Sequence, residues 1–125
     1  MKYLLKNNRD GSPAVYKTTL CVSQDERYIY FDFVAEHSDY YCPYGKYNDI
    51  HSCGDAVEVL IGTDPTRKTY YELEVNPNNV KMLAKMTVTE LDDDGAAKLN
   101  IEFVDEKDCF FTSSTAKTPD GYIAC

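Results

Sequence analysis

The sequence has no tryptophan, no long hydrophobic run and few basic residues. Its 125 residues include 13 Lys and Arg against 21 Asp and Glu, which gives a formal net charge of −8. Nucleic acids and anionic membrane surfaces select basic patches, so we expect neither as a partner. No segment is apolar for long enough to span a bilayer or to act as a signal peptide. As written, the sequence predicts a cytoplasmic protein, or an extracellular one if it was excised from a larger secreted protein.

The sequence also lacks the cysteine patterns of metal sites and redox motifs. Its 5 cysteines are odd in number, so at least one cannot pair within the chain. None forms a C-x-x-C motif or a Cys/His set with zinc spacing. We therefore expect reduced thiols, with a single bridge between Cys42 and Cys53 as the alternative.

Short segments of alternating polar and apolar residues are the main structural signal. In one of them, Val57, Val59 and Ile61 share a face and Glu58 points the other way, which is typical of a half-buried strand. Turn residues separate the segments. We expect strands at residues 14–22, 27–36, 55–62, 69–76, 80–90, 96–104, 109–115 and 121–125. About eight strands without a helix predict one all-β domain, an antiparallel β-sandwich of immunoglobulin-like or jelly-roll-like type.

Acidic residues cluster in two places, and neither predicts catalysis. Glu58, Glu72 and Glu74 lie on adjacent expected strands, and carboxylate pairs hydrolyse glycosides in other proteins. Carboxylates on an outer sheet face are far more often simply solvated, so we expect no enzyme. The acidic run at 92–95 has Phe103 at its twelfth position, where an EF-hand needs glutamate. Its Asp-Gly pair predicts a hairpin turn instead.

The longest irregular stretch, residues 37–54, holds the clearest functional hint. A sugar ring stacks its C–H groups on an aromatic face, while its hydroxyl groups bind nearby carboxylates and amides. The candidate ligand-binding residues are Tyr44, Tyr47, Asn48, Asp55 and Glu58. Two other interpretations remain open: these tyrosines pack the loop onto the sandwich edge, or they form a protein interface.

Several ordered motifs resemble a known family. They are Tyr-Ile-Tyr-Phe-Asp-Phe at 28–33, Lys-Tyr-Asn-Asp at 46–49, Gly-Asp-Ala-Val-Glu-Val-Leu-Ile at 54–61 and Tyr-Tyr-Glu-Leu-Glu-Val-Asn-Pro-Asn at 70–78. Together they resemble the family 9 carbohydrate-binding modules and their DOMON-like relatives, over roughly residues 13–125. The resemblance implies a β-sandwich that binds an oligo- or polysaccharide without catalysis, often with structural calcium, and with Glu58 at a ligand-contacting position.

The sequence departs from that family at two points. Ser52 stands where sugar-binding members have one of two clamping aromatics. The family also continues into further strands beyond the position of Cys125, so the resemblance implies a sandwich that lacks the last strands. Exposed strand edges would then favour self-association. An alternative function is therefore a sandwich that has lost its sugar site and serves as a protein-interaction or structural module.

A third function follows from DOMON relatives that bind haem through Met and His. Met82 or Met86 would pair with His37 or His51 in such a site. The simpler interpretation is that the methionines belong to the core and the histidines to loops.

Overall fold

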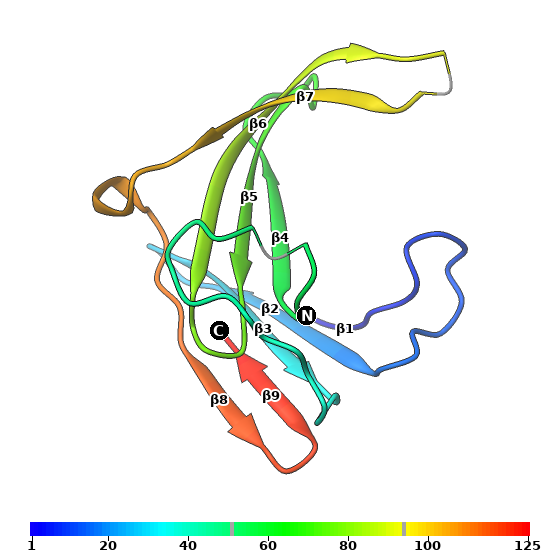
Figure 1. The fold of residues 1–125 in the computed structure, drawn as a ribbon, viewed down its shortest axis with the longest axis vertical. Coiled ribbons are helices and arrows are strands. Elements are labelled where there is room, and N and C mark those ends of the chain that lie inside the picture. Colours follow the sequence, from blue (N-terminus) through cyan, green and yellow to red (C-terminus); the bar gives the residue numbers. More distant parts are fainter. Residues whose placement is uncertain (51, 94) are drawn as a thin grey trace.

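The computed structural model describes residues 1–50, 52–93 and 95–125, and within them the chain forms nine strands in two antiparallel sheets (Figure 1). The five-stranded sheet has the order β1-β2-β3-β9-β8, with β1 (Lys2–Leu4), β2 (Thr18–Gln24), β3 (Ile29–Ala35), β8 (Thr115–Thr118) and β9 (Gly121–Ala124). The four-stranded sheet has the order β4-β5-β6-β7, with β4 (Val57–Gly62), β5 (Thr69–Val75), β6 (Lys81–Leu91) and β7 (Ala97–Phe103). The expected all-β antiparallel sandwich is confirmed.

The core lies between the sheets and follows the alternation of the strands. Phe33 and Ala35 of β3 stand opposite Ala124 and Tyr122 of β9, and all four side chains are buried. Val59 of β4 packs against this cluster from the other sheet. Because side chains alternate between the faces of a strand, Glu58 of β4 must point away from the core. We call the side of the four-stranded sheet that Glu58 occupies the outer face.

The hairpin expected at 92–95 joins β6 to β7, with strand pairing from Leu91 and Ala97 onward. The N–H of Asp92 donates to the carbonyl of Ala96 (2.9 Å), and the N–H of Ala96 donates to the Asp92 carboxylate (2.7 Å). Asp94 lies outside the described residues. The segment at 80–90, whose composition also suits a helix, is strand because it pairs with β5 on one side and β7 on the other.

Two strand predictions were wrong in part. The strand expected at 14–22 is β2, and it begins at Thr18 rather than at residue 14, since Tyr16 leaves the sheet to stack on His37 (3.8 Å between ring centroids). Residues 109–114 are not a strand, and β8 begins only at Thr115. A 3-10 turn, η1 (Glu106–Asp108), and this segment connect β7 of one sheet to β8 of the other. A chain that crosses between sheets cannot remain paired with either, which explains the missing strand.

All five cysteines are free, so the alternative bridge is absent. The thiol of Cys42 accepts a hydrogen bond from the Asn78 amide (3.3 Å) rather than facing a second sulfur. No helix in the described part of the chain is long and apolar enough to cross a membrane.

Candidate functional site

The expected site loop is held to the sheets by its own polar side chains. Asn48 has a left-handed backbone (φ 62°), a conformation that asparagine tolerates better than most residues. Its side-chain oxygen accepts from the N–H of Leu83 and its amide donates to the carbonyl of Val104, both at 2.9 Å. Asn48 thus joins β6 to the chain after β7, and both ends of its amide are used within the fold.

Tyr44 and Asp55 have similar structural contacts. The Tyr44 hydroxyl accepts from the N–H of Cys53 (3.1 Å), and its carbonyl accepts from the buried Asn76 amide (3.2 Å). The Asp55 carboxylate accepts from the N–H of Tyr41 (2.7 Å) and lies 3.0 Å from Nδ1 of His37. These contacts close the loop from both ends.

Tyr47 turns its hydroxyl inward. That hydroxyl is buried without a hydrogen-bond partner among the described residues, and this burial, followed by the neighbouring Cys109 and the charge of Glu106, raises the pKa of Tyr47. A phenol in this position supports the loop.

Glu58 is different, because it belongs to a cluster of three carboxylates on the outer face. Glu58 stands opposite Glu74 on β5, and Glu72 follows two residues away on the same side. One oxygen from each of Glu58, Glu72 and Glu74 lies within 4.8 Å of the others. The alternation of residues 69–76 already places Glu72 and Glu74 on the face of Glu58, so this grouping was available from the sequence.

Mutual repulsion and burial alter the acidity of this cluster. Burial, and then the charge of Glu72, raise the pKa of Glu58. Burial, and then the charges of Glu72 and Glu58, raise the pKa of the Tyr70 phenol. The second shift shows that Tyr70, two residues before Glu72 on β5, lies in the field of the same carboxylates.

Aromatic and apolar side chains complete the outer face. Residues directly opposite each other on paired strands share a face, and Ala84 of β6 stands between Glu72 of β5 and Phe103 of β7. Phe103 is 45% exposed and Leu60 of β4 is 58% exposed. The outer face consists of Glu58, Leu60, Tyr70, Glu72, Glu74, Met82, Ala84, Met86, Ile101 and Phe103. Phe103 and Glu72 therefore stand on either side of the buried Ala84, and Tyr70 lies two residues along β5 from Glu72, opposite Met86.

The raised pKa of Glu58 leads to a prediction for stability. A folded-state pKa above the ordinary value of 4.5 means that the folded chain binds protons more tightly than the unfolded chain. The carboxylate therefore lowers stability above the folded pKa, and this cost vanishes below 4.5. Glu58→Gln should raise the free energy of unfolding in urea at about pH 7 and lose that gain by about pH 4.

The matched control for this experiment is Glu26→Gln, which changes an exposed carboxylate outside the cluster. It should show no comparable gain at either pH. If the gain from Glu58→Gln is the same at both pH values, the carboxylates of the outer face do not repel one another as described.

The residues proposed as haem ligands make other contacts, are buried, or lie outside the described residues. His37 is held by Asp55 and by stacking on Tyr16, and Met82 and Met86 are buried at 3% and 6% exposure. His51 lies outside the described residues. The described side chains therefore supply no histidine turned toward an open ligand space.

No family model, no curated protein and no solved structure matches this chain. The likeness to family 9 carbohydrate-binding modules rests on the sequence motifs alone. What the site can do must be argued from its geometry.

Proposed function

We propose that this protein is a non-catalytic carbohydrate-binding domain that binds an oligo- or polysaccharide on its outer face. The observation that supports this most directly is the carboxylate cluster of Glu58, Glu72 and Glu74 beside Tyr70. Carboxylates accept hydrogen bonds from sugar hydroxyl groups, and bonds to charged groups are stronger than neutral ones. An aromatic ring next to them supplies an apolar surface for the sugar C–H groups.

Two aromatic residues of the outer face are available to stack on sugar rings. Tyr70 lies on β5 and Phe103 on β7, two strands apart, with β6 between them. Two strand spacings amount to about 10 Å, and Tyr70 lies two residues along β5 from Glu72, the residue in line with Phe103. The two aromatics are therefore placed to contact different rings of one oligosaccharide. Ala84, Met82 and Met86 are buried, and Tyr70 packs against them, so these residues form the apolar base of the outer face. Phe103 and Tyr70 thus replace the loop tyrosines as the proposed stacking residues.

Binding suits this face better than hydrolysis does. A glycosidase places its two carboxyl groups on opposite sides of the bond that it cleaves. Here all three carboxylates project from neighbouring positions of one sheet face. Glu58 and Glu72, which are more exposed than the buried Glu74, can contact adjacent hydroxyl groups of one sugar, but the carboxylates do not face each other across a glycosidic bond.

The same cluster fits calcium by the chemistry of its donors. Calcium takes six to eight oxygen ligands and favours carboxylates, and Glu58, Glu72 and Glu74 would hold it. A calcium ion would neutralise their repulsion and orient sugar hydroxyl groups. Sugar binding is therefore best measured both with calcium and with a chelator.

Affinity electrophoresis in gels that contain different soluble polysaccharides tests the proposal. We expect at least one polysaccharide to retard the protein, and Glu72→Gln and Tyr70→Ala to weaken retention by about tenfold, as loss of a charged hydrogen bond or a stacked ring implies. Glu26→Gln is the matched control and should leave retention unchanged. Equal retention of all variants would place any sugar site elsewhere, and no retention by folded protein would refute the proposal.

A protein-interaction module, the alternative expected from the sequence, is supported by a different surface. That surface is the apolar groove between the two sheets.

A further inference from the structure

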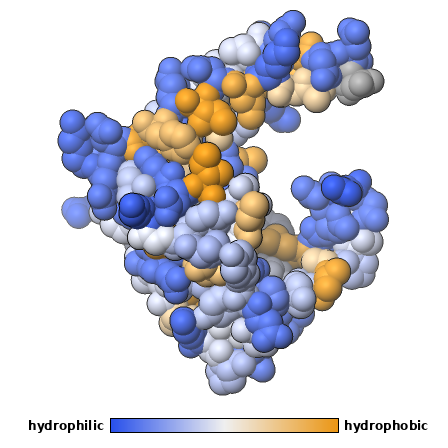
Figure 2. Space-filling model, viewed as in Figure 1, coloured by the Kyte–Doolittle hydropathy of each residue, from blue (hydrophilic) through white to orange (hydrophobic). Residues whose placement is uncertain are grey.

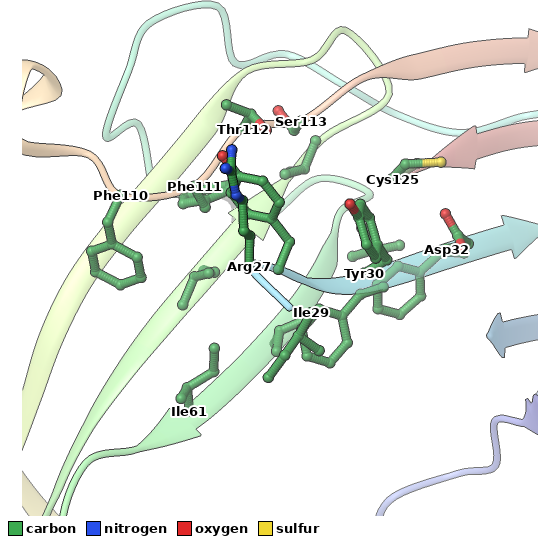
Figure 3. Close-up of a pocket in the computed structure, with 18 residues that line it drawn as sticks. Arg27, Ile29, Tyr30, Asp32, Ile61, Phe110, Phe111, Thr112, Ser113 and Cys125 are labelled. Carbon is green, nitrogen blue, oxygen red and sulfur yellow. The ribbon is translucent and has the colours of Figure 1, made fainter. Parts of the chain in front are cut away.

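β7 forms an edge of the four-stranded sheet that no described strand covers. It is the last strand in the order β4-β5-β6-β7, and all 7 of its residues are exposed. In Figure 1 it lies near the top of the view, away from the five-stranded sheet. β7 contributes no residue to the apolar groove between the sheets, which Ile61 and Phe111 line (Figure 3). A partner of this edge therefore binds outside the groove.

The main-chain groups that point to this open edge belong to the odd-numbered residues. Val104, the next residue after β7, donates its N–H to the carbonyl of Leu83 in β6 (3.0 Å). Main-chain polar groups of successive residues point to opposite sides of a strand. Those of Leu99, Ile101 and Phe103 therefore point away from β6. A strand added at this edge has to pair with these residues.

The two charged residues of β7 stand symmetrically about Asn100. Lys98 precedes Asn100 by two positions, and Glu102 follows it by two. When two copies of β7 lie antiparallel with their Asn100 residues opposite each other, Lys98 of each copy stands opposite Glu102 of the other. Opposite charges at directly opposed positions stabilise a strand pair. β4, at the other edge of the same sheet, has Glu58 as its only charged residue and lacks this pattern.

The same register also satisfies the main chain. It places Leu99 opposite Ile101 of the second copy, so the residues whose main-chain groups face the edge pair with one another. Each such pair can exchange two main-chain hydrogen bonds. A shift by one residue would oppose these groups to groups that point toward β6. A shift by two would separate Lys98 from Glu102, so the register centred on Asn100 is the one that meets both requirements.

Ion pairs within each copy extend this charge pattern. Nζ of Lys98 lies 2.6 Å from a carboxylate oxygen of Glu90, and Nζ of Lys85 lies 3.9 Å from one of Glu102. Across the paired edge, Lys85 and Glu102 of one copy are followed by Lys98 and Glu90 of the other. The four side chains form a row of alternating charge, and all of them are accessible to solvent in the single chain.

Apolar side chains of β7 gain contacts on the other face. Leu99, Ile101 and Phe103 are 41%, 47% and 45% exposed, and Figure 2 shows exposed hydrophobic residues along the part of the molecule where β7 runs. Phe103 stands opposite Ala84 on the outer face, and alternation places Leu99 and Ile101 on the same face. In the paired edge, Leu99 packs beside Ile101 of the second copy, which removes apolar surface from water.

We propose that two copies of this chain form a two-fold symmetric dimer through β7, with the strands antiparallel and Asn100 at the axis. The two four-stranded sheets then form one continuous sheet. Because residues of the outer face pair with residues of the outer face, the outer faces of both copies lie on the same side of it. Main-chain hydrogen bonds join the edges, as in other cases of strand addition, and the pairs of Lys98 with Glu102 set the register.

Sedimentation velocity tests whether the dimer forms. The wild-type chain should pass reversibly from monomer to dimer between about 10 µM and 1 mM, because a contact of this small size is weak. Over the same range, the amide signals of Leu99, Ile101 and Phe103 in ¹⁵N-labelled protein should shift, whereas those of Ile29 and Phe31 beside the groove should not. A chain that stays monomeric, or a dimer whose formation shifts Ile29 and Phe31 instead, would overturn the proposal.

Charge reversal tests the register. Lys98→Glu and Glu102→Lys each turn two attractive pairs into two repulsive ones, so each should raise the dissociation constant of the dimer at least about tenfold. A mixture of the two variants opposes glutamates to lysines at both pairs and should form a heterodimer of nearly wild-type affinity. The same two proteins are measured alone and mixed, so a folding defect cannot produce this recovery.

The matched controls are Lys6→Glu and Glu26→Lys, which make the same charge changes at exposed positions outside β7. Neither should alter the dissociation constant of the dimer. If the dimer tolerates both Lys98→Glu and Glu102→Lys, or if their mixture dimerises no better than either variant alone, the proposed pairing through β7 is wrong.

Discussion

Leu83→Ala should lower the free energy of unfolding by about 3 kcal/mol, the middle of the range for a buried leucine that is replaced by alanine. Leu83 lies at 0% exposure in β6, the strand that pairs with both β5 and β7. Removal of its side chain leaves a cavity that the two neighbouring strands prevent from collapsing. For a chain of this size, we expect the melting temperature to fall by about 10 °C.

The matched control is Leu91→Ala, at the other end of the same strand. Leu91 is 64% exposed, so its replacement should change stability by less than about 0.5 kcal/mol. Urea denaturation of both variants beside the wild type gives the comparison. Similar losses for the two leucines would show that β6 is not buried as described.

Asn48→Ala should cost about 3 kcal/mol for a different reason. It leaves the N–H of Leu83 and the carbonyl of Val104 without the two 2.9 Å hydrogen bonds of the amide, and each lost partner costs about 1 kcal/mol or more. It also forces alanine into the left-handed conformation at φ 62°, which costs roughly 1 kcal/mol.

Asn48→Gly separates these two contributions. Glycine adopts a positive φ freely, so this variant loses the hydrogen bonds but avoids the strain. We expect it to be about 1 kcal/mol more stable than Asn48→Ala and still clearly less stable than the wild type in urea denaturation. A glycine variant as stable as the wild type would mean that the amide does not link the loop to β6.

The strands with strong alternation were predictable from the sequence, and those without it were not. β4 was predictable from the alternation of Val57, Val59 and Ile61 alone. β5 and β6, which pair next to it, continue the same alternation. β1, of only three residues, has too few positions to show a period. Phe110 and Phe111 are apolar enough for a strand, but they line the groove where the chain passes between sheets.

The candidate site was only partly predictable. Glu58 on an outward position follows from alternation, and so do Glu72 and Tyr70 beside it. The use of Asn48 within the fold was not visible, because its partners Leu83 and Val104 lie 35 and 56 positions further along the chain. The position of Phe103 depends on the register between β6 and β7, which the sequence does not specify when a bulge lies at Val88–Glu90.

The proposed sugar site and the apolar groove lie on opposite faces of the four-stranded sheet. Glu58 and Glu72 belong to the outer face, whereas Val59 and Leu73, their neighbours in the chain, line the groove. Alternation along a strand gives each face its own chemistry, with the carboxylates on the outer face and an aliphatic lining in the groove.

The measurement that tests the proposed function most directly is an NMR titration of the ¹⁵N-labelled protein with a short oligosaccharide from the polysaccharide that retards it most. We predict shifts of the amide signals of Glu58, Tyr70, Glu72 and Phe103, with Ile29 and Phe31 in the groove unaffected. Shifts confined to the groove, or none at concentrations where the parent polysaccharide retards the protein, would contradict a sugar site on the outer face.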